Sequence, residues 1–164
     1  VQATQDIVAE LSLVYNKAAV VLHNLRLLLG DEVFWRGLRR FYFDWRFKKA
    51  STLDVQRAFE AESGQDLSVY FDGWIHTSGI PVVRFSWARE AGATDTAALV
   101  RFEQVGAVFD LPVAVTLHFA DRTTRDVIVP VRSRTTEFRV PFTGDLRDIT
   151  VKEDGTTLVS VYRQ

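Results

Sequence analysis

The fold class is decided by the stretch GIPVVRFSW at residues 79–87, where the spacing of the apolar residues changes. Before this stretch, apolar side chains recur every three or four residues, which is typical of amphipathic helices. From Val83 and Phe85 onward they recur at every second position, as in a strand with one buried face. Gly79 and Pro81 separate the two patterns, because both residues end helical structure. The sequence therefore predicts helices first and strands second.

About four helices are expected upstream of this stretch. The first runs from about Asp6 to Leu29, where Gly30 serves as its C-terminal cap. Asp31 can cap a second helix that runs to about Trp45. The apolar stripe of the first helix is expected to comprise Leu11, Ala18, Leu22, Leu25 and Leu29, and that of the second Phe34, Leu38, Phe41, Tyr42 and Trp45.

Two further helices complete the predicted helical half. Ser51 or Thr52 caps a third helix from about Leu53 to Glu62, which Ser63-Gly64 ends. Asp66 opens a fourth helix. Its apolar residues are Leu67, Tyr70, Phe71 and Trp74.

About seven short strands are expected downstream. Turn-like breaks fall at Gly92, Gly106, Asp121-Arg122, Gly144-Asp145 and Asp154-Gly155. Alternation with one buried face favours an antiparallel β-sandwich. The predicted class is thus α+β, with residues 1–80 forming helices and residues 81–164 a seven-stranded sandwich. No Ser/Gly-rich linker separates the two parts, so we expect them to pack tightly.

Composition excludes several functional classes. The 164 residues carry a formal net charge of −1 and contain neither cysteine nor methionine. A phosphate-binding surface needs an excess of basic residues that neither half of the chain carries, so no nucleic-acid partner is expected. No apolar run approaches the roughly 20 residues of a membrane helix, and no membrane segment is expected. A chain that starts at Val1 and lacks methionine is expected to be a piece of a larger protein. The compartment stays undetermined.

The residues themselves give little support for a metal site or for a catalytic nucleophile. The three histidines, His23, His76 and His118, fall in a helix, a helix end and a strand, and no His-Glu-x-x-His is present. Since metal sites usually need three protein ligands, we expect no metal ligands in this chain. There is no Gly-x-Ser-x-Gly, no cysteine and no glycine-rich phosphate loop. Carboxylate pairs such as Asp31-Glu32 and Glu60/Glu62 are interpreted as solvated.

The densest charge cluster lies between residues 36 and 49 and has aromatic residues between its charges. A groove for single-stranded nucleic acid has a similar pattern. However, the aromatic residues keep helical spacing and are interpreted as core, while Asp31, Glu32 and Asp44 offset the positive charge. The basic residues are Arg36, Arg39, Arg40, Arg46, Lys48 and Lys49.

Tyr15 is the candidate catalytic residue. On a helical wheel, Leu22 falls within about 40° of Tyr15 and Leu25 within about 80°. By pattern alone, such a tyrosine at the margin of an apolar stripe is most often a packed ring with its hydroxyl in water. His23 lies about 80° round the helix from Tyr15 and would not act with it as a local pair.

An ordered set of motifs gives Tyr15 a further meaning. The set begins with Tyr15-Asn16-Lys17-Ala18-Ala19 and continues with LRLLLGDE at residues 25–32 and with Phe34-Trp35. Later members are Thr52-Leu53-Asp54, Ser63-Gly64-x-Asp66-Leu67, Phe71-Asp72-x-Trp74 and Gly79-x-Pro81. Together they resemble the region that follows the zinc site in the aminopeptidase N-like gluzincin metallopeptidases. The resemblance covers essentially the whole chain.

The resemblance implies a parent enzyme that removes N-terminal residues from peptides. In that family the tyrosine matching Tyr15 donates a hydrogen bond to the oxyanion of the attacked peptide carbonyl. The zinc expected in the parent would be held by a His-Glu-x-x-His segment upstream, so the chain alone is expected to bind no cofactor and hydrolyse nothing. The implied partners are the upstream catalytic domain and, in the parent, a peptide substrate.

One departure from the family pattern keeps an alternative open. Ala18 stands where the family commonly has glycine, and its added methyl group is expected to push the helix slightly from its neighbour. A non-catalytic scaffold or protein-interaction module from an inactive relative is therefore the alternative. A glycan-binding sandwich is a third possibility that rests on fold analogy alone.

Overall fold

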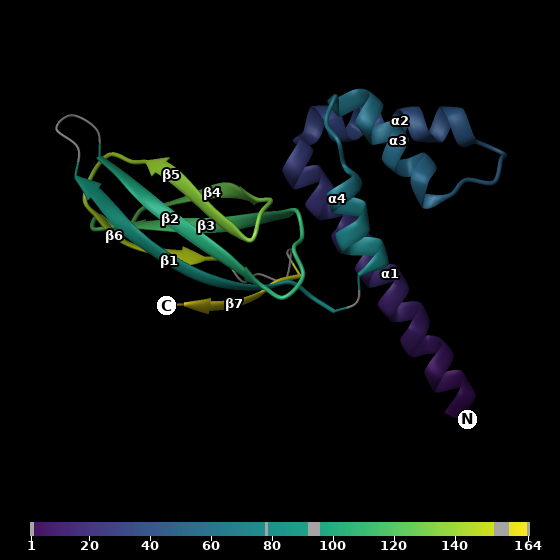
Figure 1. The fold of residues 1–164 in the computed structure, drawn as a ribbon, viewed down its shortest axis with the longest axis horizontal. Helices are drawn as coiled ribbons and strands as arrows, with labels where there is room; N and C mark the ends of the chain where they lie inside the picture. The colour runs from purple at the N-terminus through teal and green to yellow at the C-terminus, as the bar shows by residue number, and fades with distance from the viewer. Residues whose placement is uncertain (1, 78, 92–95, 153–157, 164) are drawn as a thin grey trace.

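The computed structural model describes residues 2–77, 79–91, 96–152 and 158–163, without the side chains of residues 2–14, 91 and 96. A helical half precedes a two-sheet half, and the N-terminal part of the first helix extends away from both (Figure 1). The helical elements are α1 (Gln2–Leu29), α2 (Asp31–Trp45), α3 (Thr52–Ser63), α4 (Ser68–Phe71) and η1 (Asp72–His76). The strands are β1 (Val82–Ala91), β2 (Thr96–Val105), β3 (Leu111–Phe119), β4 (Thr124–Val131), β5 (Thr135–Pro141), β6 (Leu146–Val151) and β7 (Ser160–Arg163). The predicted α+β class is confirmed, although the predicted breaks at Gly92 and Asp154-Gly155 lie outside the described residues.

Helix α1 buries only part of its predicted apolar stripe. Leu25 is buried and Leu29 packs against the core, as predicted, whereas Ala18 and Leu22 are exposed. Val21 and Asn24 are buried instead. The segment from Ala18 to Leu29 is apolar on most sides, so periodicity alone could not select the buried face. Leu11 lies among the residues whose side chains are not described.

Helices α2 and α3 pack closely at Gly37. A Cβ atom at Gly37 would lie 2.5 Å from the ring of Phe59, so only glycine fits there without a shift. At the start of α3, the Asp54 carboxylate accepts hydrogen bonds from the Ser51 backbone N–H at 2.8 Å and from the Ser51 Oγ at 2.6 Å. These bonds lower the pKa of Asp54 and confirm the predicted cap at Ser51.

Two predictions for α2 were wrong. Asp31 is the first residue of the helix rather than its cap, and its carboxylate binds Arg26 of α1 at 2.7 and 2.8 Å. The pattern could not separate capping from a cross-helix ion pair, because both use the same carboxylate. Tyr42, expected in the core, is 62% exposed.

The fourth helical segment changes its winding. Four α-helical residues, Ser68–Phe71, continue directly into a π-helical turn, Asp72–His76. Tyr70 and Phe71 are buried in the α-helical part and Trp74 in the wider turn, as the pattern predicted.

The second half is a two-sheet sandwich with strand orders β5-β2-β1-β7 and β4-β3-β6. Buried residues such as Phe85 and Phe102 on one sheet and Val115 and Leu117 on the other form its core. The prediction of purely antiparallel pairing was wrong, because β7 runs parallel to β1, with Val82 opposite Ser160. Alternation fixes the faces of a strand but not the direction of its neighbour.

One hydrophobic core joins the two halves. The Trp74 ring lies 5.4 Å from the Phe109 ring, and its Nε1–H donates to the Asp110 carbonyl at 3.3 Å. A Cβ atom at Gly73 would lie 3.0 Å from Phe109, so the π-helical turn contacts the sandwich closely. The expectation of tight packing is confirmed.

Candidate functional site

Tyr15 lies on the solvent-facing side of α1. Its side chain is 70% exposed. At about 100° per residue, Tyr15 is about 120° round the helix from the buried Val21 and within about 40° of the exposed Leu22. Within the described chain the phenol is therefore directed away from the core, on a face where Ala18 and Ala19 are also exposed.

Ala18 lies near Tyr15 on this exposed face. Its methyl group is therefore not enclosed by the core of the described residues. The expected displacement of the helix by this methyl group stays a prediction.

The three histidines do not form a common site. His23 lies within α1, His76 ends η1, and the Nε2 of His118 in β3 lies 2.9 Å from the Thr150 Oγ1. In the parts of the chain that the structure describes, no three His, Cys, Asp or Glu residues gather closely enough to hold a metal ion. These residues do not fit a zinc ion, so any zinc chemistry would depend on residues outside them.

The carboxylates near α2 are ion-paired rather than merely solvated. Glu62 binds Arg36 at 3.2 Å and Arg40 at 2.9 Å, and these partners lower the pKa of Glu62. Glu32 also binds Arg36, at 2.6 Å. The sequence missed these contacts because Glu62 is 22 residues or more from either arginine. They neutralise the middle of the basic cluster and support its structural interpretation.

Exposed apolar side chains are concentrated on the helical half. Of the large apolar side chains that the structure describes as exposed, those in strands are Val105, Ile128 and Tyr162. Those of the helical half are Tyr15, Leu22, Trp35, Tyr42, Phe43, Phe47, Leu53, Val69, Ile75 and Ile80. The interpretation of the aromatic residues between these basic residues as core was therefore wrong for Tyr42, Phe43 and Phe47.

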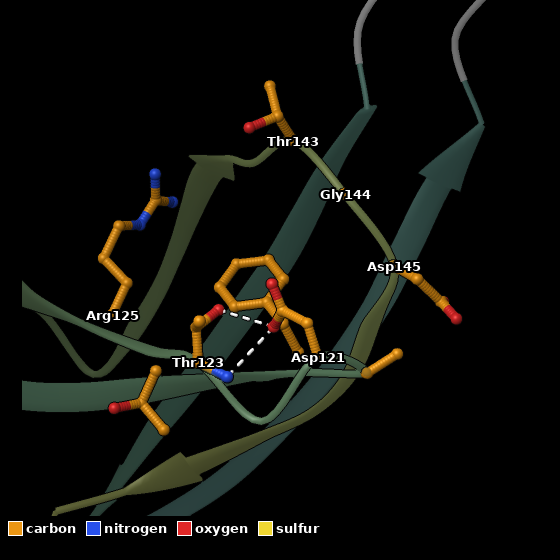
Figure 2. A pocket seen from close by; sticks show the side chains of 9 residues that line it. Asp121, Thr123, Arg125, Thr143, Gly144 and Asp145 are labelled. Carbon is orange, nitrogen blue, oxygen red and sulfur yellow. Dashed lines mark hydrogen bonds between the residues drawn. The ribbon is translucent and has the colours of Figure 1, made fainter.

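A hollow of about 480 Å³ lies at the end of the sandwich where β3 ends and β4 begins (Figure 2). The Asp121 carboxylate in it accepts hydrogen bonds from the Thr123 backbone N–H at 2.9 Å and Oγ1 at 2.7 Å, and these bonds lower the pKa of Asp121. Arg125 donates to the Pro141 carbonyl, and Asp145 pairs with Arg89 at 3.5 Å. Its charged groups, Asp121, Arg125 and Asp145, are thus engaged within the sandwich. Because β3 starts beside the helical half and spans nine residues, the hollow lies at the opposite end from α4.

Two buried polar groups at the junction of the halves were not foreseen. Both amide atoms of Asn24, and Oδ1 of Asp110, have no hydrogen-bond partner within the described residues. Burial raises the pKa of Asp110, although Arg132 at 3.4 Å opposes the shift. In the sequence, Asn24 only interrupts an apolar run, and nothing marks Asp110 as buried.

None of the described helices is both long and apolar enough to cross a membrane.

Residues 3–74 match the peptidase family M1 domain. The chain is 35% identical over 72 residues to aminopeptidase N of Lactococcus lactis subsp. lactis, which covers 44% of this chain and 8% of that protein. It is 32% identical over 89 residues to aminopeptidase N of Streptomyces lividans, covering 54% of this chain and 10% of that protein. The chain thus spans about a tenth of the length of these relatives.

A solved structure shares the fold of nearly the whole chain. The crystal structure of Legionella pneumophila aminopeptidase A in complex with aspartic acid superposes with a TM-score of 0.71 at 19% sequence identity. The match covers 90% of this chain and 17% of that one, so it includes strands as well as helices. Together the sequence match of residues 3–74 to the peptidase family M1 domain, the relatives and the shared fold support an aminopeptidase N-like fragment.

Proposed function

We propose that this chain is the part of a zinc aminopeptidase that supplies Tyr15 to the catalytic site and a structural β-sandwich behind it. The parent would hydrolyse N-terminal peptide bonds. The observation that carries the proposal is the position of Tyr15, whose phenol is 70% exposed on a helix within the region matched by the M1 domain.

A phenol in this position suits the stabilisation of an oxyanion. As the peptide carbonyl is attacked, negative charge develops on its oxygen, and the Tyr15 O–H would donate a hydrogen bond to that oxygen. A neutral donor supplies this stabilisation without becoming a competing metal ligand. Zinc, if bound as in M1 peptidases generally, would be held by residues of the parent outside this chain.

We further propose two domains: the helices, residues 1–80, belong to the catalytic domain, and residues 81–164 form a separate sandwich domain. The end of η1 at His76 and the start of β1 at Val82 support this boundary. The exposed apolar side chains of the helical half support the docking of a further part of the catalytic domain on that half, since apolar patches of this kind mark interaction surfaces.

The test compares the zinc-loaded full-length protein with its Tyr15→Phe variant in the hydrolysis of an aminoacyl arylamide. Loss of one oxyanion donor is expected to lower kcat on the order of 100-fold or more, with zinc content and circular dichroism unchanged. Tyr42→Phe is a matched control, because Tyr42 is similarly exposed, at 62%, but lies on α2. If Tyr15→Phe retained full activity, the proposed role of Tyr15 would be wrong.

Ala18, at the position where the family commonly has glycine, favours one second candidate, a non-catalytic scaffold. A full-length protein without arylamidase activity, whose sequence upstream of Val1 lacks His-Glu-x-x-His, would support the scaffold instead.

A further inference from the structure

We propose that Tyr70 is a positioning residue for Tyr15. Its buried hydroxyl ties α1, the helix that carries Tyr15, to α4 and through η1 to the sandwich. The inference rests on the function proposed for Tyr15, and it adds a role for the sandwich in setting the place of that residue.

The direct tie is a hydrogen bond from the Tyr70 hydroxyl to α1. Tyr70 is fully buried, and its hydroxyl donates to the backbone carbonyl of Val21. Val21 follows Tyr15 by six residues on the same helix, which corresponds to about 9 Å along the axis. A fixed point this close to Tyr15 limits both the sliding and the rotation of the helix.

The hydroxyl is held in its donating form. Burial raises the pKa of Tyr70, and the negative charge of the nearby Asp110 raises it further. Tyr70 therefore stays protonated at any physiological pH, and the bond to the Val21 carbonyl does not depend on a titration in that range.

The tie continues from α4 into the sandwich. The Tyr70 ring lies 6.3 Å from the Trp74 ring, which lies 5.4 Å from the Phe109 ring. Trp74 also donates to the Asp110 carbonyl, and the Asp110 carboxylate pairs with Arg132 at 3.4 Å. Trp74, Phe109 and Asp110 are buried, although Arg132 is exposed. A close-packed path therefore links the segment just before β3 to Val21.

The hydroxyl can be removed without disturbing the core. The Val21 carbonyl lies inside a helix and also accepts the intrahelical N–H four residues on. Tyr70→Phe keeps the ring and its packing, so it removes only the directional contact between α1 and α4. A second polar contact of α1, the Arg26–Asp31 ion pair, lies at the C-terminal end of the helix and is exposed.

The experiment is a double-mutant cycle in the full-length protein. The kcat for an aminoacyl arylamide is measured for the natural protein, Tyr15→Phe, Tyr70→Phe and the double variant. Because small misplacements of a catalytic group are costly, Tyr70→Phe is expected to lower kcat about tenfold with little change in KM. In the Tyr15→Phe background it is expected to have no further effect, because the group that it positions is gone.

A merely structural role would give a different result. If Tyr70→Phe lowered kcat equally in both backgrounds, or not at all, the positioning role would be overturned. If Tyr15→Phe itself left kcat unchanged, both the proposed function and the positioning role would fail, whereas failure of the Tyr70 arm alone would leave the proposed function intact.

Hydrogen exchange in the 164-residue chain provides a readout without activity. Tyr70→Phe is expected to speed the exchange of the amides of residues 19–27 by at least severalfold. Tyr162→Phe, whose ring is 59% exposed on β7, is the matched control and should leave these amides unchanged. Unchanged exchange in Tyr70→Phe would show that the hydroxyl does not hold α1, and would overturn the inference.

Discussion

The helical half and the sandwich half differ in how completely they bury their apolar residues. In the sandwich, side chains such as Val100, Phe102 and Leu117 are sealed between two sheets. In the helical half, Phe59 and Tyr70 are just as buried, yet most of the large exposed apolar side chains also lie there. Apolar surface of this kind often marks an interaction site. The sandwich thus encloses its apolar residues more completely than the helical half, and this difference supports the docking surface proposed for the helical half.

The largest effect on stability is expected from a substitution at the junction between the two halves. Trp74→Ala removes a ring that is 1% exposed and contacts both halves, so the free energy of unfolding is expected to fall by about 3–5 kcal/mol. Urea unfolding followed by circular dichroism measures the change. Trp35→Ala is the control, because Trp35 is 46% exposed, and it should cost about 1 kcal/mol or less. Equal losses in the two variants would mean that the junction contributes no more than the surface.

A substitution at Asn24 measures how much an unpaired buried amide on the core-facing side of α1 costs in stability. Because both its amide atoms are buried without a partner among the described residues, Asn24→Leu is expected to raise the free energy of unfolding by about 1–3 kcal/mol. Ala19→Leu, at an exposed position of the same helix, should change it little. Destabilisation by Asn24→Leu in urea unfolding would show that the amide makes a favourable contact after all.

The smallest effect on stability is expected from a substitution at Asp110, and this effect depends on pH. Since burial raises its pKa in the folded state, folding is accompanied by proton uptake between the ordinary pKa of an aspartate, near 3.9, and the raised value. In that range the ionised carboxylate costs stability that is regained as the pH falls. Asp110→Asn removes this cost, so its stability relative to the natural chain is expected to increase as the pH rises from about 4 to 7. A difference that stayed constant across this range in urea unfolding would contradict the raised pKa.

The arrangement of elements could be read from the sequence to a large extent. The change of period near Val83 separated helices from strands, and Ser51 was a correct cap, because these features depend on local geometry. The family resemblance carried by Tyr15 to Glu32 and the later motifs was also correct, as the M1 match over residues 3–74 shows. The role of Tyr15 itself stays a prediction.

Other features required the folded chain. The buried face of α1, the exposure of Tyr42, the pairing of Glu62 with Arg36 and the burial of Asp110 all depend on residues distant in sequence. Helical periodicity identifies a face only when the other faces are polar, and α1 is apolar around most of its circumference.

By itself, the sequence determined which segments form helices and strands and which family the chain resembles, because periodicity, caps and motif order are properties of neighbouring residues. Only the tertiary structure decided that β7 runs parallel to β1, that Tyr15 is directed away from the core, and that the Tyr70 hydroxyl binds the Val21 carbonyl. Each of these depends on where a partner from a distant segment lies, and local spacing places no limit on that partner's position.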